Sequence, residues 1–308
     1  MPTSLEVGAG IAVIDTRMAD TAGLTSSYLV RASAPAIIET GPATSADPVI
    51  ASLARLGVGA NDLAHVVVTH IHLDHAGAAG HLAEHFPRST IWVHEIGAPH
   101  LAEPSRLMAS AARVYGEERL QRLFGTMRPV PADRIRTLGE ADMIDLGNRS
   151  LTALYTPGHA RHHVALQDRS SGAVFTGDAV GIHLPGIALL RPATPPPEFD
   201  MELAIRSIER IRRHARWTLM FSHFGPVGSV DETCTVAIET IRRWGELVHA
   251  IMATTEDLTA VSAALEAATR AEHVGLSDGE RRHLEAVSSY ETNSAGLLRY
   301  WSTPAAPS

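Results

Sequence analysis

The chain has 308 residues, 45% of them hydrophobic, and 26 basic side chains stand against 34 acidic ones. The formal net charge of −8 argues against a nucleic-acid partner held by neutralised phosphates, and no apolar run approaches the roughly 20 residues that cross a bilayer. The single cysteine, Cys234, excludes an internal disulfide and a cysteine-based zinc site. Because Met1 to Gly10 also lack the pattern of a signal peptide, we expect a cytoplasmic protein without a membrane partner.

The first half of the chain predicts strands that alternate with helices. Strands are expected at 27–30, 36–39, 66–68 and 90–93, the first two as a hairpin. Helices are expected at 47–56, 76–86 and 104–124. Asp47 is the expected N-cap of the first helix, with Pro48 at its first position. This alternation is typical of an α/β layer.

The second half begins with short strands and ends with helices. Strands are expected at 142–146, 150–155, 163–167, 173–176 and 218–222, with a hairpin turn at 170–172. Helices are expected at 200–214, 231–252, 258–271 and 277–288, the last with a capping box at Ser277. We therefore expect an α/β body over residues 1–229 and an α-helical C-terminal region over residues 230–308, ending in a loose tail at 303–308.

The densest polar cluster directly follows the buried strand at 66–68. The segment His70-Ile71-His72-Leu73-Asp74-His75 places three histidines and one aspartate in six positions. These side chains are ligands of divalent metals. If the segment leaves the strand as a loop, His70 and His72 can serve one ion, and Asp74 and His75 a neighbouring ion.

Three later strands end with a glycine beside a ligand-type residue. They are the segments Thr156–His159, Phe175–Asp178 and Phe221–Gly225, which supply His159, Asp178 and His223. Strand ends hold side chains rigidly, and a neighbouring glycine lets the backbone pass close to a site. Their order behind the first cluster indicates one shared metal centre.

On these motifs the chain resembles the metallo-β-lactamase superfamily, in its glyoxalase II-like branch, over about residues 10–229. The resemblance implies a four-layered αββα sandwich with the metal site at one edge between two sheets. The ligands it implies are His70, His72 and His159 for a first ion, Asp74, His75 and His223 for a second, and Asp178 as the bridge. Glu39-Thr40-Gly41 stands where the family usually has Asp-Thr-Gly, in a supporting position.

The chemistry of this ligand set suits two borderline divalent ions, with Zn²⁺ expected and Mn²⁺ or Fe²⁺ as alternatives. Two such ions lower the pKa of a bridging water, and the resulting hydroxide attacks a carbonyl or phosphoryl centre. Asp74 is the expected catalytic residue, orienting that nucleophile or accepting its proton. Thr69 and His163 are expected to support the ligands from behind. For the pair His162 and His163, the alternative is that one is paired in a strand and the other exposed.

We therefore predict a dinuclear metal-dependent hydrolase of a small ester, thioester or lactone. The alternatives are a mononuclear-iron persulfide dioxygenase of the same fold, a phosphodiesterase, and a metal-binding scaffold without turnover. Asp178 weakens a β-lactamase assignment, because the antibiotic hydrolases usually carry Cys or Ser there. Gly181 weakens a lactonase assignment, because the lactonases that the motifs resemble carry tyrosine at that position.

Two features bear on the partners of this enzyme. The apolar, proline-rich loop 181–199 is expected either to clamp the C-terminal region to the body or to form an apolar wall for the substrate. A small-molecule substrate is the expected partner. A homodimer is also expected, because two-fold dimers are the commonest oligomers of soluble proteins.

Overall fold

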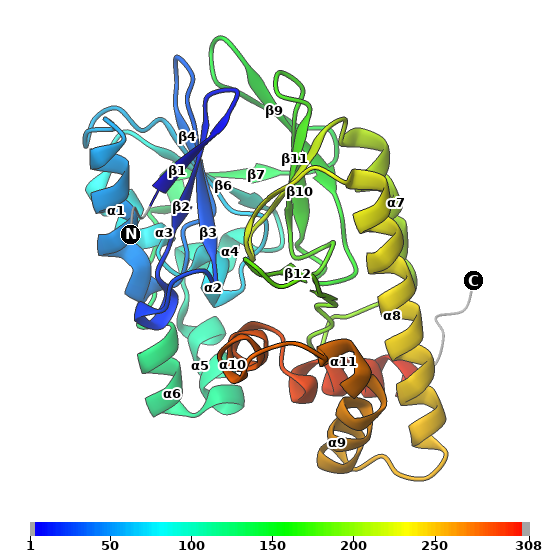
Figure 1. Cartoon of the computed structure of the whole chain (residues 1–308). Coiled ribbons are helices and arrows are strands. Elements are labelled where there is room, and N and C mark those ends of the chain that lie inside the picture. Colours follow the sequence, from blue (N-terminus) through cyan, green and yellow to red (C-terminus); the bar gives the residue numbers. More distant parts are fainter. Residues whose placement is uncertain (1–3, 304–308) are drawn as a thin grey trace.

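The structure, a computed structural model, describes residues 4–303. Figure 1 shows two β-sheets packed face to face, with helices on the outer side of each. The seven strands of the first sheet lie in chain order: β1 (Ser4–Gly8), β2 (Ile11–Asp15), β3 (Ser26–Val30), β4 (Ala36–Ile38), β5 (His65–Val67), β6 (Thr90–His94) and β7 (Ile135–Leu138). The pairs from β1 to β4 are antiparallel, and those from β4 to β7 are parallel.

The second sheet has the order β15-β14-β11-β10-β9-β8. Its strands are β8 (Met143–Asp145), β9 (Ser150–Tyr155), β10 (Val164–Asp168), β11 (Ala173–Gly177), β14 (Thr218–Phe221) and β15 (Gly225–Val227). Only β11 and β14 pair in parallel within this sheet. Two short strands, β12 (Ile182–His183) and β13 (Leu190–Arg191), form a separate ribbon beside it.

The helices form the outer layers. The first sheet is covered by α1 (Ala46–Arg55), α2 (Leu73–Ala76), α3 (Ala79–His85), α4 (Ala98–Ala102), α5 (Ser105–Tyr115) and α6 (Glu117–Leu123). The second sheet is covered by α7 (Met201–His214) and α8 (Val230–Met252), followed by α9 (Leu258–Thr269), α10 (Asp278–Val287) and α11 (Tyr290–Ser302). Short 3₁₀ turns complete the chain: η1 (Met18–Asp20), η2 (Ala43–Ser45), η3 (Ala132–Arg134) and η4 (Arg270–His273).

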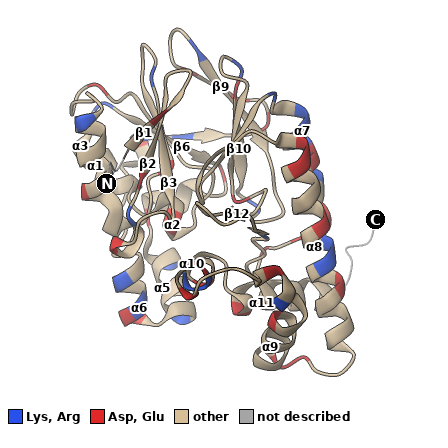
Figure 2. Ribbon diagram, in the orientation of Figure 1, with Lys and Arg blue, Asp and Glu red and all other residues tan. Residues whose placement is uncertain are grey.

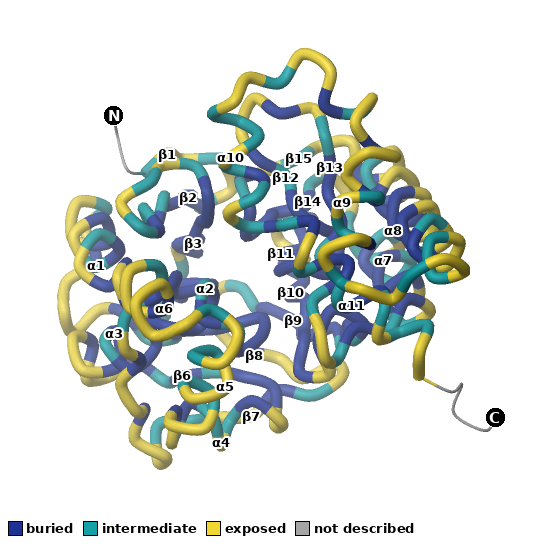
Figure 3. The backbone as a smooth tube through the Cα atoms, turned by 90° about the horizontal axis from the view of Figure 1, so that it is seen from below, coloured by how far each residue is buried: buried dark blue, intermediate teal, exposed yellow. Residues whose placement is uncertain are grey.

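Alternation along the strands produces these layers. In β2, Ile11 and Val13 face the core between the sheets, whereas Ala12 and Ile14 face the helices. In β11, Phe175 joins the core between the sheets and Val174 the outer one. Successive strand side chains point to opposite faces, so strands that are apolar throughout are buried on both sides. Charged residues lie mainly on the outer helices (Figure 2), and central strands such as β3, β10 and β11 are buried throughout (Figure 3).

The predicted αββα sandwich with a C-terminal set of helices is confirmed. The C-terminal helices share a hydrophobic core with the second sheet, through buried residues such as Trp244 of α8 and Leu297 of α11. The boundary between residues 229 and 230 stays a prediction. No helix in residues 4–303 combines the length and the apolar character of a membrane span. The predicted loose tail, apart from Thr303, lies outside the described residues.

Several predicted boundaries are wrong. The helix expected at 104–124 is two helices, because Gly116 has a φ of 74° and ends α5. The helix expected at 76–86 is also two, α2 and α3, and the first already begins at Leu73. Helix α1 begins at Ala46, so Asp47 lies in its first turn and is not the N-cap. The elements β1, β2, β7, β12, β13, β15, α4 and α11 were not predicted individually, and the ribbon of β12 and β13 lies within the segment expected as a loop.

The loop 181–199 packs against the C-terminal helices. Ile182, Leu184 and Ile187 are buried in one cluster with Leu284 of α10. Thr194 donates its backbone N–H to Asn293 Oδ1 of α11, and its hydroxyl donates to the Asn293 carbonyl and to Oδ1. These contacts support the interpretation of the loop as a clamp. Val287 of α10 packs against this cluster and also against the helices of the first half, so that α10 joins the two halves.

Candidate metal centre

The seven residues expected as ligands lie at the ends of strands from both sheets. His70 and His72 lie between β5 and α2, and Asp74 and His75 lie in α2 itself. The other three follow single strands of the second sheet: His159 after β9, Asp178 after β11 and His223 after β14. The structure brings all seven together at one edge of the sandwich, as the atom distances below show.

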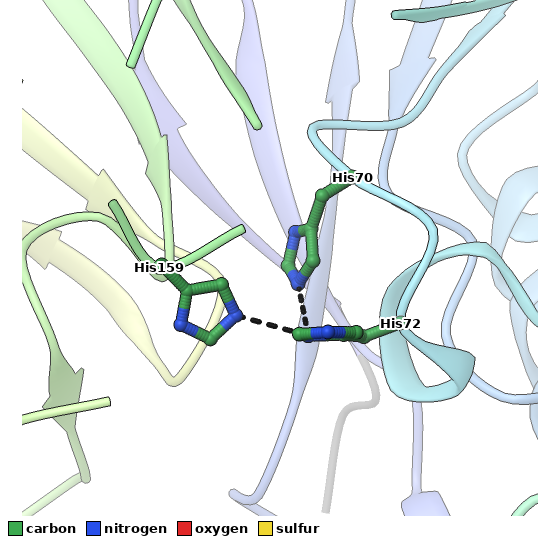
Figure 4. A group of neighbouring side chains, drawn as sticks. All are labelled: His70, His72 and His159. Carbon is green, nitrogen blue, oxygen red and sulfur yellow. Dashed lines mark hydrogen bonds between the residues drawn. The ribbon is translucent and has the colours of Figure 1, made fainter. Parts of the chain in front are cut away.

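The first group consists of three histidines that point toward one another (Figure 4). His72 Nδ1 lies 3.0 Å from His70 Nε2 and 2.9 Å from His159 Nε2. The three nitrogens form a set that can hold a metal ion. Three imidazole nitrogens on one side of an ion match the protein ligands of a catalytic zinc site, which keeps a further position open.

The second group combines a carboxylate with two histidines. Asp74 Oδ2 lies 3.4 Å from His223 Nε2 and 3.6 Å from His75 Nε2, and the three residues form another possible metal set. Both Nε2 atoms are buried and have no hydrogen-bond partner. A buried polar atom without a partner is costly, so these two nitrogens fit a site in which an ion is their partner.

The carboxylate of Asp178 faces both groups. Its Oδ1 lies 3.4 Å from His75 Nε2 and 3.6 Å from His223 Nε2. Its Oδ2 lies 3.6 Å from His159 Nε2. Oδ1 is also buried without a hydrogen-bond partner. One oxygen for each group is the arrangement that a bridging carboxylate requires.

The far ring nitrogens of three histidines are held by acceptors outside the cluster. His223 Nδ1 donates to the Leu24 carbonyl over 2.8 Å, and His159 Nδ1 donates to the Ala193 carbonyl over 3.0 Å. His75 Nδ1 lies 3.2 Å from Glu39 Oε1. Because a carbonyl oxygen only accepts, His159 and His223 carry a proton on Nδ1 and can present a lone pair from Nε2. Such outer hydrogen bonds orient metal-binding histidines.

Glu39 links the two groups from behind. This side chain is 1% exposed, and it accepts hydrogen bonds from Thr69 Oγ1 at 2.5 Å and Ser222 Oγ at 3.0 Å. Since Thr69 Oγ1 donates to Glu39, it accepts from His70 Nδ1 at 2.9 Å, which leaves Nε2 of His70 free for the site. Glu39 thus orients His70 through Thr69 and His75 directly. Thr69 lies where the sequence predicted a supporting residue.

His163 holds the backbone of Asp178. Its Nε2 accepts the Asp178 N–H over 3.2 Å, and its Nδ1 lies 2.8 Å from Thr156 Oγ1. Gly177 leaves room for this ring, because a Cβ there would lie 2.3 Å from His163 Nε2. His162 is also buried, and its Nδ1 accepts the Ile71 N–H over 3.4 Å. The alternative in which one of these two histidines is exposed is therefore wrong.

The two groups differ in electrostatics. Burial lowers the pKa of His70, and it lowers the pKa of His72 to about 3, with neighbouring rings adding to the effect. Burial alone would raise the pKa of Asp178, but His75 and His223 outweigh it and hold that pKa well below its usual range. The carboxylates in turn overcome burial and raise the pKa of both His75 and His223. Without ions, the first group is neutral and the second is a charged network.

Some supporting groups were missed from the sequence. Ser222 directly precedes His223, and this position next to a predicted ligand is the one feature of the sequence that points to its role. The carbonyls of Leu24 and Ala193 gave no signal, because any residue type supplies a carbonyl and only the fold brings them to the histidines.

Comparison with protein families and curated proteins gives consistent matches. The profile of the metallo-beta-lactamase superfamily matches residues 20–223. The metallo-beta-lactamase fold-containing protein ST1585 of Sulfurisphaera tokodaii is 28% identical over 169 residues, 54% of this chain and 62% of that protein. The acyl-coenzyme A thioesterase MBLAC2 of Gallus gallus is 30% identical over 184 residues, 56% of this chain and 64% of that protein.

A more distant relative is the hydroxyacylglutathione hydrolase of Gloeothece citriformis, 29% identical over 139 residues, 44% of this chain and 41% of that protein. The matches thus span less than two thirds of the length of these three relatives. Among solved structures, archaeal ST1585 from Sulfolobus tokodaii superposes with a TM-score of 0.69 at 22% identity, covering 94% of this chain and 98% of that one. The subclass B3 metallo-beta-lactamase MEM-A1 from a soil metagenome library gives 0.58 at 18% identity, covering 78% and 94%.

Proposed function

This chain belongs to the metallo-beta-lactamase superfamily, and from that premise we propose that it is a dinuclear metal-dependent hydrolase that cleaves a thioester. The observation that carries the two-ion proposal is the Asp178 carboxylate, with one oxygen toward each of two ligand groups. Two divalent ions held there, with Zn²⁺ expected, would supply a nucleophilic water of lowered pKa and positive charge for the developing oxyanion.

The chain's own residues have distinct roles in this proposal. His70, His72 and His159 hold one ion, and Asp74, His75 and His223 hold the other, with Asp178 between them. Asp74 is also the catalytic carboxylate, because its side chain is 20% exposed whereas that of Asp178 is 7% exposed. It can therefore reach the attacking water, orient it and accept its proton.

The choice of a thioester rests on the relatives. The matched proteins include an acyl-coenzyme A thioesterase and hydroxyacylglutathione hydrolases, and the names of both describe thioester cleavage. Asp178 argues against a β-lactam substrate, because the antibiotic hydrolases usually carry Cys or Ser at that position. A small ester or lactone stays within the same chemistry, since the attacked carbonyl is the same.

A mononuclear-iron dioxygenase of the same fold is the competing proposal. It would use His70 or His72, His159 and Asp178, and would leave the second group without an ion. The buried, unpartnered Nε2 atoms of His75 and His223 argue against that arrangement.

The test combines metal analysis with a substrate panel on the purified protein. We expect elemental mass spectrometry to find two divalent ions per chain. We also expect thioesters to be hydrolysed faster than esters, lactones and phosphodiesters. One iron per chain with sulfur-dependent oxygen uptake would replace the hydrolase by the dioxygenase. Two ions without turnover on any substrate would indicate a scaffold. His85→Ala, at an exposed histidine outside the cluster, is the matched control for ligand variants.

A further inference from the structure

A cavity lies in the C-terminal helices, and none of its lining residues belongs to the candidate metal centre. Its volume is about 240 Å³, and it is lined by Glu266, Arg270, His273, Val274 and Arg281. These residues come from α9, η4, the turn after η4, and α10. The lining carries two guanidinium groups against one carboxylate, in a chain with an excess of acidic residues. A local excess of positive charge in a cavity points to an anionic ligand.

The two arginines of the lining differ in how firmly other groups of the protein hold their side chains. Within residues 4–303, the side chain of Arg270 makes no hydrogen bond or ion pair, and the residue is exposed. Arg281 is half-buried, and its Nη2 donates to the carbonyls of His273 and Leu276 over 2.8 and 3.0 Å. One end of the Arg281 fork is therefore fixed, while its other N–H groups stay available. Arginine presents N–H groups in pairs that match the oxygens of a phosphate.

His273 also lines the cavity, and its ring is held in place from behind. It is 6% exposed, and its Nε2 accepts a hydrogen bond from Arg191 Nη2 over 3.1 Å. Because Arg191 can only donate, the proton of the neutral ring is on Nδ1. Arg191 is itself 2% exposed and is fixed by Glu285 Oε1 at 2.5 Å, by the Ser288 carbonyl, and by the ring of Tyr290. The buried network thus sets the ring that lines the cavity.

We propose that this cavity binds the phosphate groups of the carrier to which the acyl group is attached, the carrier being coenzyme A or a nucleotide-bearing thiol of the same kind. This inference rests on the proposed thioesterase function. Glu266 lies one helical turn before Arg270, and its carboxylate repels a small free anion in the cavity. The rest of the carrier must therefore contribute to binding, which favours a large ligand over inorganic phosphate.

A chain of contacts connects this cavity to the metal centre. Arg191, beneath His273, belongs to β13, which pairs with Ile182 of β12. The preceding residue, Gly181, donates its N–H to the carbonyl of Asp178 over 3.0 Å. On the other side, Arg281 lies on α10, whose Leu284 packs against Ile182. The clamp thus contacts both the wall of the cavity and the backbone of Asp178.

The first experiment measures steady-state hydrolysis of one acyl group on three carriers: coenzyme A, dephospho-coenzyme A and pantetheine. Wild-type enzyme is compared with Arg270→Gln, and Arg282→Gln is the matched control, since Arg282 is an exposed α10 neighbour outside the lining. Loss of a charge-assisted hydrogen bond predicts a KM for the coenzyme A thioester that rises about tenfold or more in Arg270→Gln. We expect unchanged kcat, an unchanged KM for the pantetheine thioester, and no effect of Arg282→Gln.

The second experiment measures binding of coenzyme A without an acyl group, and of inorganic phosphate, by calorimetry on the same three proteins. Weaker coenzyme A binding in Arg270→Gln supports the cavity even if no thioester is hydrolysed, in which case only the proposed function fails. Equal coenzyme A binding in all three proteins, with equal KM values for all carriers, overturns the cavity proposal. Binding of inorganic phosphate as tight as that of coenzyme A overturns the assignment to a carrier.

Discussion

The two groups of the candidate metal centre are neighbours with opposite electrostatics. His70, His72 and His159 face one another, and burial keeps the pKa of each ring below its ordinary value. In the other group, carboxylates raise the pKa of His75 and His223. The first group can therefore accept an ion without losing ring protons, whereas the second exchanges protons for an ion. Sequence motifs alone describe both groups as equivalent sets of ligands.

The largest effect is expected from Asp178, which both groups share. Asp178→Asn keeps the shape of the side chain but removes its charge, and Asp178→Ala removes the bridge altogether. Substitutions of residues that only support metal ligands already lower metal affinity or activity about 10–100-fold. We therefore expect kcat/KM to fall by more than about 100-fold in both variants. The metal content should fall below two ions per chain, as elemental analysis measures. Retained turnover in either variant would contradict the bridging role.

Single ligand variants separate the two groups. His72→Ala removes a ligand from the first group, and His223→Ala removes one from the second. We expect each variant to lose its own ion, to keep close to one ion per chain, and to lose most activity, on the order of 100-fold. Loss of both ions in both variants would show that the groups bind as one unit, and the comparison above would then not hold.

A smaller effect is expected from Glu39, which supports one histidine of each group. Glu39→Gln keeps the size of the side chain but replaces one acceptor oxygen by a donor, so Thr69 and His75 lose part of their orientation. We expect a 10–100-fold loss of affinity for both ions, measured by competition with a chelator. Glu6→Gln, at an exposed glutamate, is the control. Weakening of one ion only would limit the role of Glu39 to that group.

The smallest effect is the pH dependence of loading the metal-free protein. The raised pKa of His75 and His223 means that these rings hold protons near neutral pH, and an ion must displace them. The rings of the first group have lowered pKa values and are already unprotonated. Affinity for the second ion should therefore rise with pH more steeply than affinity for the first. Proton release measured in weak buffer checks this, and equal release for both ions would contradict it.

The positions of the ligand-type residues could be predicted because each follows a strand with a clear pattern. Val66 to Val68 is apolar throughout and His70 follows at once, so the sequence marks both the strand and its end. Similarly, the glycine before Asp178 marks the end of β11. The αββα sandwich itself was implied by the family resemblance that these motifs carry.

Other features depend on contacts that no local pattern contains. Gly116 lies within an amphipathic pattern, and only its positive φ shows that α5 ends there. Gly77 separates α2 from α3, where a Cβ would lie 2.8 Å from the Ala43 backbone nitrogen, a contact between distant parts of the chain. The role of Ser222 likewise requires Glu39 beside it, more than 180 positions earlier in the chain.

The order of the ligands along the chain has a consequence for how the protein is made. Four of the seven ligand-type residues lie in the segment His70–His75, which leaves the ribosome long before His159, Asp178 and His223. Until β14 has been synthesised, the nascent chain contains the histidines of the first segment without all of the residues that complete the candidate site. The candidate site can therefore be completed only at a late stage of translation, and a chain that stops before His223 would carry six of the seven ligand-type residues and an incomplete second group.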